Sequence, residues 1–236
     1  MTDALRVGID SLVETVAEVK PRLRGWLHLG SAPLTLVAGI VLVALSPTAA
    51  TRIGSAVYVA SALLLFTVSA VYHRGHWSAR TTRVLRRFDH ANIFVLIAGS
   101  YTPFTLLLLH GRERVVLLVT VWAAALLGVL FRVLWVGAPR WLHTPIYFAM
   151  GWVAVFFIGD FAQGAEHRLG VGVGTAVLVL IVAGGALYMA GGVVYGFRRP
   201  DPWPRWFGFH EVFHTLTVLA FMTHYVGVSL ATYSLR

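Results

Sequence analysis

The chain has 236 residues, of which 58% are hydrophobic and only 12% charged, and its mean hydropathy is +0.75. A soluble domain is nearer half apolar and a quarter charged, so a core of this size cannot hide these side chains and lipid must solvate many of them. The absence of cysteine excludes disulfides and thiolate ligands, which leaves His, Asp and Glu to bind any metal.

The net charge of +9 does not indicate nucleic acid as a partner. The basic residues lie in short loops between apolar stretches, where they set orientation and contact anionic lipid headgroups. We therefore expect a multi-pass protein of the bacterial plasma membrane whose partners are membrane lipids.

The N-terminal segment, residues 1–25, differs from the rest of the chain. Apolar residues recur over 3–19 at spacings of three and four, with acidic residues between them. This pattern predicts a cytoplasmic amphipathic helix on the membrane surface, although an ordinary solvated helix would show the same pattern. The segment lacks a continuous apolar stretch, so we expect no cleaved signal peptide.

Residues 26–236 are predicted to form one transmembrane domain of seven helices. Each apolar stretch is close to the ~20 residues that a helix needs to cross the bilayer. An all-α fold follows because lipid-facing backbone groups must be satisfied within their own segment. The expected spans are 26–46, 53–73, 89–109, 115–136, 142–161, 171–196 and 210–232.

The orientation of these spans follows from Lys and Arg, which are enriched in cytoplasmic loops. Fourteen of the 19 basic residues fall on the side of the N-terminus, and the others are Arg52, Arg112, Arg114, Arg168 and Arg236. We therefore expect the N-terminus to be cytoplasmic and the C-terminus to be outside.

Four ionisable side chains from distant spans are predicted to meet at the cytoplasmic end. His210 and His214 are four residues apart on one helix face, which lets both bind one metal ion. His73 ends the second span, and Asp89 opens the third. Three imidazoles with one open position are typical of a catalytic zinc site, in which Asp89 could hold the metal-bound water or accept its proton.

The remaining histidines are weaker candidates. His28 begins the first span on the same side and could support the site from behind. His224 lies about 15 Å along the helix from His214 and cannot join the same metal. The HEVFH string at 210–214 also matches a metalloprotease pattern with Glu211 as general base, but no acidic residue follows to serve as a third ligand.

Several strings together resemble the PAQR family, in its bacterial hemolysin III branch. They are SAVYH at 69–73, FDHANI at 88–93, AGSYTPF at 98–104 and GFHEVFH at 208–214. The family includes the adiponectin and progestin receptors and is similar to the alkaline ceramidases. The resemblance implies a cytoplasmic-side zinc on His73, His210 and His214, with Asp89 contacting the zinc-bound water and Ser69 in the same cluster.

The resemblance also implies a pocket open towards lipid and ceramidase-like amide hydrolysis. Bacterial relatives often carry Asn and Thr before the first His, whereas this chain reads Gly25-Trp26-Leu27-His28, so no role carries over to His28. Three functions remain open: a zinc-dependent lipid hydrolase active in lipid homeostasis, a non-enzymatic lipid sensor with structural zinc, and a pore-forming hemolysin. The clustering of polar residues at one end argues against the pore.

Overall fold

The computed structural model describes residues 21–135, 137 and 140–236, and this part of the chain is helical with no β-strand. The all-α prediction is therefore confirmed for these residues. Residues 1–20, which hold most of the expected amphipathic segment, lie outside the described part. The helices are α2 (Trp26–Ala44), α3 (Ala49–Arg74), α4 (Ala79–Leu108), α5 (Gly111–Leu134), α6 (Arg140–Trp152), the 3-10 helix η1 (Val153–Phe157), α7 (Ile158–Phe197) and α8 (Phe209–Tyr233).

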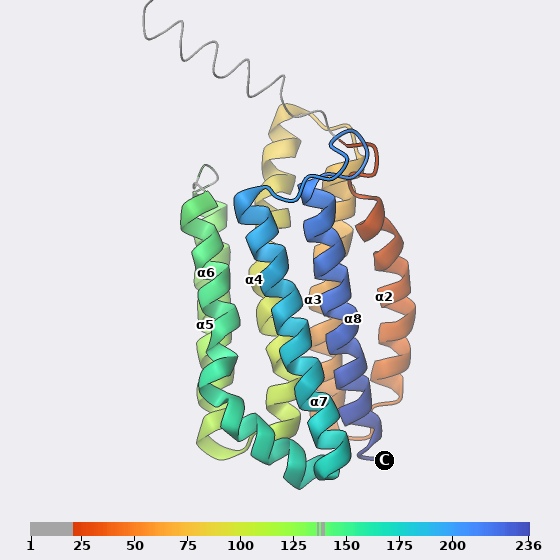
Figure 1. The fold of residues 1–236 in the computed structure, drawn as a ribbon, viewed down its shortest axis with the longest axis vertical. Helices are drawn as coiled ribbons and strands as arrows, with labels where there is room; N and C mark the ends of the chain where they lie inside the picture. The colour runs from red at the N-terminus through yellow and green to blue at the C-terminus, as the bar shows by residue number, and fades with distance from the viewer. Residues whose placement is uncertain (1–20, 136, 138–139) are drawn as a thin grey trace, which may run out of the picture.

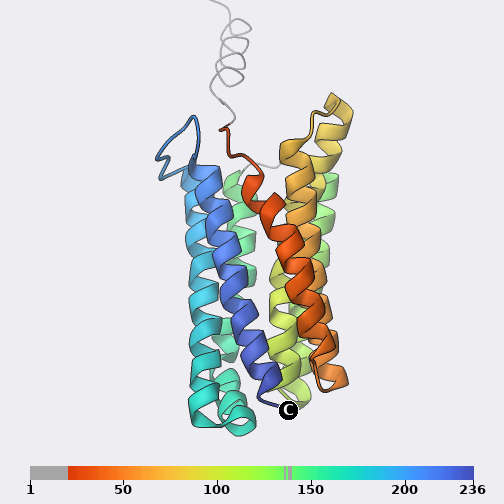
Figure 2. The ribbon, with the colours of Figure 1, turned by 90° about the vertical axis from the view of Figure 1, so that its right-hand side faces the viewer.

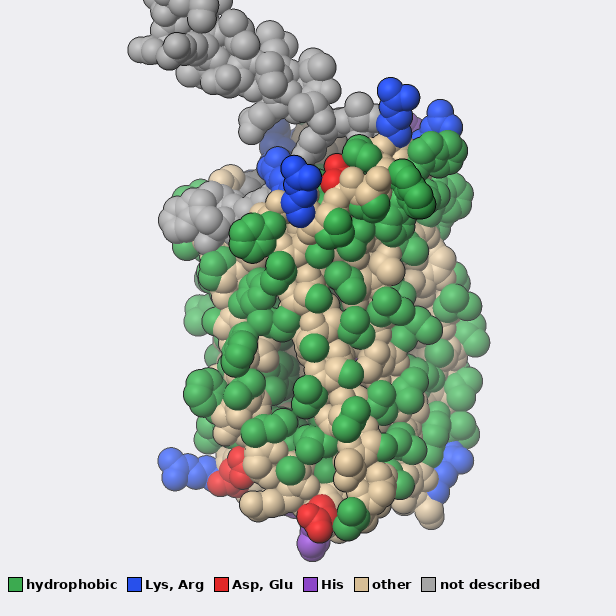
Figure 3. All heavy atoms as spheres, viewed as in Figure 1, with side chains coloured by type: hydrophobic (Ala, Val, Ile, Leu, Met, Phe, Trp, Pro, Cys, Tyr) green, Lys and Arg blue, Asp and Glu red, His purple; other side chains and the backbone are tan. Residues whose placement is uncertain are grey.

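Six helical segments of the described chain are long and apolar enough to cross a membrane. They run roughly parallel in one bundle, joined by short connections at its two ends (Figure 1). Figure 3 shows hydrophobic side chains over the middle of the molecule and charged side chains gathered at both ends. This distribution is that of a multi-pass membrane protein, in which charges stay out of the hydrocarbon.

One of the six segments, Leu142–Phe197, is a run of 56 residues that contains two of the expected spans. The run includes the 3-10 helix η1, and Gly170 interrupts α7 with a φ of 75°, a conformation that L side chains rarely adopt. Figure 1 shows α6 descending along one side, the chain crossing the lower end, and the later part of α7 rising through the bundle.

The third expected span begins earlier than the sequence indicated, so the expected start at Asp89 is wrong. α4 starts at Ala79, because the Ser78 hydroxyl caps it by accepting the Thr81 N–H at 3.2 Å. The arginines that follow are good helix formers and continue the helix rather than forming a loop. Asp89 therefore lies inside α4, two to three turns from its start.

Contacts in the bundle core fix the position of α3 along α8. The Tyr58 hydroxyl of α3 donates to the Phe221 carbonyl of α8 at 2.6 Å, and the two rings stack with centroids 5.1 Å apart. Phe66 lies about two turns beyond Tyr58 on the same face of α3 and meets Phe221 edge-on. α2 lies along both α3 and α8 (Figure 2), so the first helix covers the seam where they meet.

The close packing of α3 against α4 leaves no room for a side chain at Gly54 of α3. A Cβ at this position would lie 2.8 Å from the Pro103 Cα of α4, and backbone cannot yield as a side-chain tip can. We expect Gly54→Ala to destabilise the protein by about 1–3 kcal/mol through overpacking. Thermal denaturation in detergent measures the change.

The matched control is Gly30→Ala in α2, where a Cβ meets nothing within 4 Å. This substitution should be neutral or raise stability by up to about 1 kcal/mol, because alanine is the better helix former. Equal melting temperatures for the two variants would contradict the tight contact between α3 and α4.

Candidate metal centre

Three histidines from two helices meet near one end of the bundle. His73 ends α3, and His210 and His214 lie one turn apart at the start of α8. Each offers one ring nitrogen, and these three atoms all lie within 4.8 Å of one another. His73 and His214 are 7% and 3% exposed, so the cluster is enclosed. The predicted convergence of these three side chains is confirmed in the structure.

The spacing suits a metal ion bound between the rings. The Nε2 atoms of His73 and His210 are 3.2 Å apart. Two nitrogens on one tetrahedral zinc, each bound at about 2.0–2.1 Å, lie about 3.3–3.4 Å from each other. The donor set also fits, since neutral imidazole is a common zinc ligand. The His73 and His210 pair therefore already has the spacing of two ligands on one metal ion, and the His214 nitrogen lies within 4.8 Å of both.

Asp89 and Ser69 lie beside the three histidines, as expected. The Asp89 Oδ2 atom is 3.8 Å from the His73 Nε2 atom. Ser69 stands one turn before His73 on α3, and its buried hydroxyl faces Asp89 without a hydrogen bond of ordinary geometry. A carboxylate and a hydroxyl are thus available next to the position that a metal would take, although neither belongs to the three-nitrogen set.

His28 of α2 closes the cluster from the side. Its ring stacks on His214 with centroids 3.9 Å apart and planes within 10°, and it also contacts Phe66. It is 2% exposed, and neither ring nitrogen has a hydrogen-bond partner among the described residues. The sequence suggested a supporting position for His28, and the stacked ring fixes the plane of His214.

Glu211 does not occupy the place that a metalloprotease base needs. One carboxylate oxygen accepts from the Arg24 Nε, and the other accepts the Gly208 N–H at 2.8 Å. The side chain is 1% exposed and caps the start of α8. Both oxygens are therefore engaged in holding the helix terminus and the chain before α2, which makes Glu211 a structural residue here.

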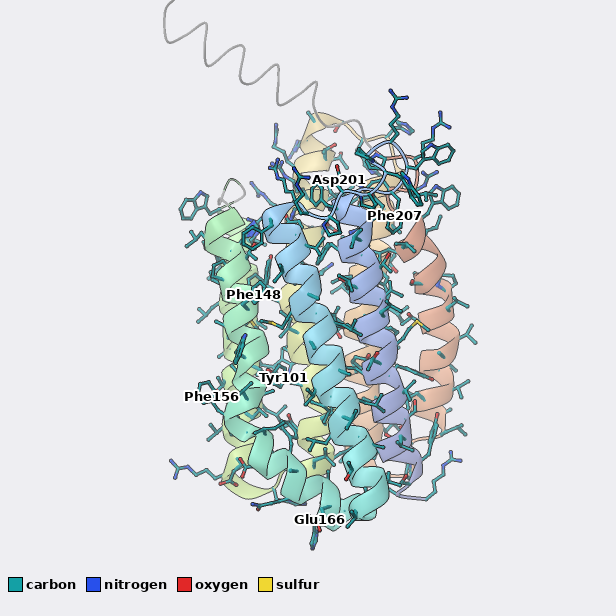
Figure 4. The ribbon with its side chains drawn as sticks, viewed as in Figure 1. Tyr101, Phe148, Phe156, Glu166, Asp201 and Phe207 are labelled. Carbon is teal, nitrogen blue, oxygen red and sulfur yellow. The ribbon has the colours of Figure 1, made fainter. Side chains whose placement is uncertain are left out.

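A largely apolar cavity of about 410 Å³ extends from the cluster into the bundle. Ser69, Asp89, His210 and His214 line one end, and His224 lines it further along α8. Figure 4 shows Tyr101 and Phe148, both on its wall, between the helices at mid-height, and Figure 3 shows this face hollowed there between α6 and α7. An apolar molecule with one reactive polar group would fit this shape.

A second group of polar side chains lies near the cluster, and no pattern in the sequence indicated it. The His90 Nε2 lies 3.2 Å from the Tyr195 hydroxyl, and the His90 Nδ1 faces the Arg86 carbonyl at 2.7 Å. Tyr147 of α6 donates to the His90 carbonyl at 3.1 Å. These contacts join α4, α6 and α7, and only a packed structure could reveal them, because no spacing within one helix relates the three residues.

The fold and the site define a helical multi-pass membrane protein with a buried histidine cluster at one end of an apolar cavity. The family model of haemolysin-III related proteins matches residues 16–225. The chain belongs to this hemolysin III family, as its resemblance indicated, and it is a protein of the plasma membrane.

Relatives of the chain come from bacteria, plants and animals. It is 35% identical over 139 residues to the hemolysin-3 homolog of Bacillus subtilis and 31% identical over 152 residues to hemolysin-3 of Bacillus cereus. The matches cover 59% and 64% of this chain, and 61% and 65% of those proteins, which is less than two thirds of their length. The heptahelical transmembrane protein ADIPOR2 of Oryza sativa is 30% identical over 190 residues, which are 74% of this chain and 80% of that protein.

The histidine cluster predicts how metal content depends on single residues. His210→Ala removes one of three ligands, so the purified variant should retain at most about a tenth of the metal bound by the original protein. Elemental analysis after purification without chelator measures the metal per chain. His76→Ala, an exposed residue outside the cluster, is the control and should keep full metal content. Equal metal in both variants would contradict the site.

Proposed function

We propose that this protein is a zinc-dependent lipid hydrolase that cleaves an amide or acyl bond of a membrane lipid and so takes part in lipid homeostasis. The observation that carries the proposal is that an apolar cavity reaches the histidine cluster: His210 and His214, two of its three members, line the cavity together with Asp89. A hydrolase for lipids needs a polar reactive end and an apolar space for the chain, side by side, and a ceramidase-like amide substrate has both parts.

The side chains in and around the cluster are proposed to have separate roles in the reaction. Zinc held by the three imidazoles would supply Lewis acidity and make water more acidic. Asp89 is the proposed general base: its carboxylate takes a proton from the attacking water and later returns it to the leaving amine or alcohol. Ser69, which faces Asp89, is proposed to orient the water or the substrate. The acyl chain would lie along the cavity.

The roles of metal and carboxylate can be separated. Asp89→Asn keeps the shape of the side chain but removes the base, so we expect metal to remain bound while hydrolysis falls by about a hundredfold or more. Turnover of a ceramide panel by purified protein in lipid nanodiscs measures activity, with and without a chelator. The reaction should also stop on metal removal and return when zinc is restored.

A lipid panel with no turnover by the zinc-loaded protein would overturn the hydrolase. Chelator-insensitive turnover would overturn the role of the metal. Undiminished turnover of Asp89→Asn would overturn the role of the carboxylate as base. Each outcome concerns a different part of the proposal, because metal content is measured on the same samples.

The second candidate is a non-enzymatic lipid sensor with structural zinc. It is favoured by the position of Asp89, whose oxygen lies 3.8 Å from His73 and could close the fourth coordination place. A closed site leaves no place for water. In that case His73→Ala should abolish folding along with metal binding, whereas in the hydrolase a folded but inactive protein is expected.

We also propose the finer topology, with seven crossings and residues 26–236 as one domain after the segment 1–25. The break at Gly170 supports two crossings within Leu142–Phe197. The excess of basic residues at the histidine-bearing end supports a cytoplasmic N-terminus and an external C-terminus.

The cysteine-free sequence allows a clean test of this topology. A single cysteine at Ser234→Cys, near the C-terminus, should react with a membrane-impermeant maleimide in intact cells. A cysteine at His76→Cys should react only after the membrane is opened. Both positions are exposed, so access depends on the side of the membrane. The reverse labelling pattern would place the C-terminus inside.

A further inference from the structure

The middle of the cavity carries two polar atoms that the proposed chemistry does not use. His224 of α8 and Tyr188 of α7 both line the cavity, with ring centroids 5.6 Å apart. The His224 Nδ1 and the Tyr188 hydroxyl oxygen are buried and have no hydrogen-bond partner among the described residues. Buried polar atoms normally have partners, so an unpaired donor and acceptor beside one cavity require an explanation.

The neighbours of His224 fix which nitrogen carries its proton. The Nε2 atom faces the Ile181 carbonyl of α7 at 3.1 Å, and a carbonyl only accepts, so Nε2 carries the hydrogen. The ring edge formed by Nε2 and Cδ2 packs on Gly184, where a Cβ would lie 2.2 Å from Cδ2. Nδ1 is the ring atom opposite that edge. It therefore points away from Gly184 with a bare lone pair and acts as an acceptor.

Tyr188 supplies the complementary group. Its hydroxyl lies near Ser100 of α4 without a hydrogen bond of ordinary geometry, and the Ser100 hydroxyl donates to the Leu96 carbonyl at 2.8 Å. Two other polar side chains that line the cavity are already engaged: the Thr217 hydroxyl donates to the Phe213 carbonyl at 2.9 Å, and the Tyr101 hydroxyl donates to the Met150 carbonyl, also at 2.9 Å. The Tyr188 hydroxyl has no partner that meets hydrogen-bond geometry, so its proton is available to a ligand in the cavity beside His224.

We propose that His224 and Tyr188 form a binding subsite for a hydroxyl group in the middle of a lipid acyl chain. A hydroxyl is the simple substituent that satisfies both atoms at once, since it donates to the His224 Nδ1 and accepts from the Tyr188 hydroxyl. A keto group would only accept and would leave Nδ1 unpaired. A saturated chain would leave both atoms unpaired.

The position of the subsite along the cavity matches a mid-chain group. His224 is ten residues beyond His214, which is about 15 Å along α8 at 1.5 Å per residue. A lipid whose polar end lies at the histidine cluster therefore places the middle of a long chain beside His224. This inference rests on the proposed function only in taking the ligand to be a lipid acyl chain with its polar end at the cluster.

Binding of matched fatty acids tests the subsite without any hydrolysis. The probes are ricinoleic acid, which has a mid-chain hydroxyl, and oleic acid, which lacks it. We expect the metal-loaded protein to bind ricinoleic acid roughly three- to tenfold more tightly, as one or two buried hydrogen bonds would give. Competition against a fluorescent fatty acid measures both affinities. In Tyr188→Phe the two acids should bind alike, and His224→Leu should show the same loss.

Two controls separate this subsite from general polarity. Tyr147→Phe removes a hydroxyl from another cavity-lining tyrosine, one that already donates to the His90 carbonyl, and should keep the preference. The isomer of ricinoleic acid that carries its hydroxyl next to the carboxyl, 2-hydroxyoleic acid, should bind no better than oleic acid. Equal binding of ricinoleic and oleic acids, or a preference that survives Tyr188→Phe, would overturn the subsite, as would a preference for the isomer equal to that for ricinoleic acid. None of these three results bears on the hydrolase proposal, and an absence of hydrolysis would not affect a measured binding preference.

Discussion

The Nε2 atoms of His73 and His210 lie 3.2 Å apart inside an apolar bundle. This contact constrains how α3 and α8 can pack and which groups can lie beside the two rings. A neutral imidazole has one donor and one acceptor, and an unpaired buried polar atom costs about 1–3 kcal/mol. With His214 beside them, the three rings bring their ring nitrogens within 4.8 Å of one another, and a cation bound there would satisfy their lone pairs. The arrangement depends on the register of α3 against α8, which the Tyr58 hydroxyl bond to the Phe221 carbonyl fixes deeper in the bundle.

The acidic residue of the HEVFH string shows how one pattern can serve two purposes. In a metalloprotease the glutamate faces the metal, whereas here Glu211 turns to Arg24 and to the Gly208 N–H. That contact ties the chain before α2 to the start of α8. Since α2 carries His28 against His214, Glu211 acts on the cluster by holding its neighbours in place, and both of its carboxylate oxygens are engaged in doing so.

The sequence could predict what periodicity and topology determine. The four-residue spacing placed His210 and His214 on one helix face. Because successive spans alternate in direction, the end of the second span and the start of the third lie on the same side of the membrane as the start of the last, which brings His73 and Asp89 to the same end. It could not place the start of α4 at Ala79, because the arginines that looked like a loop are also good helix formers. It also missed that His224 lines the same cavity, although His210, His214, Thr217 and His224 recur at helical spacing on one face of α8.

This shared face of α8 gives the cavity a polarity along its length. Its cytoplasmic-side end, as we propose the orientation, holds nitrogen and carboxylate groups suited to a metal and a proton. Its largely apolar middle holds the His224 and Tyr188 pair, whose free polar atoms have no partner among the described residues. In the proposed hydrolase the two sets would act on different parts of a lipid, because the ligands at the end would meet the bond to be broken and the pair would meet the chain. A substitution in the pair should therefore change which lipid is held, whereas a substitution in the cluster changes whether any lipid is cleaved.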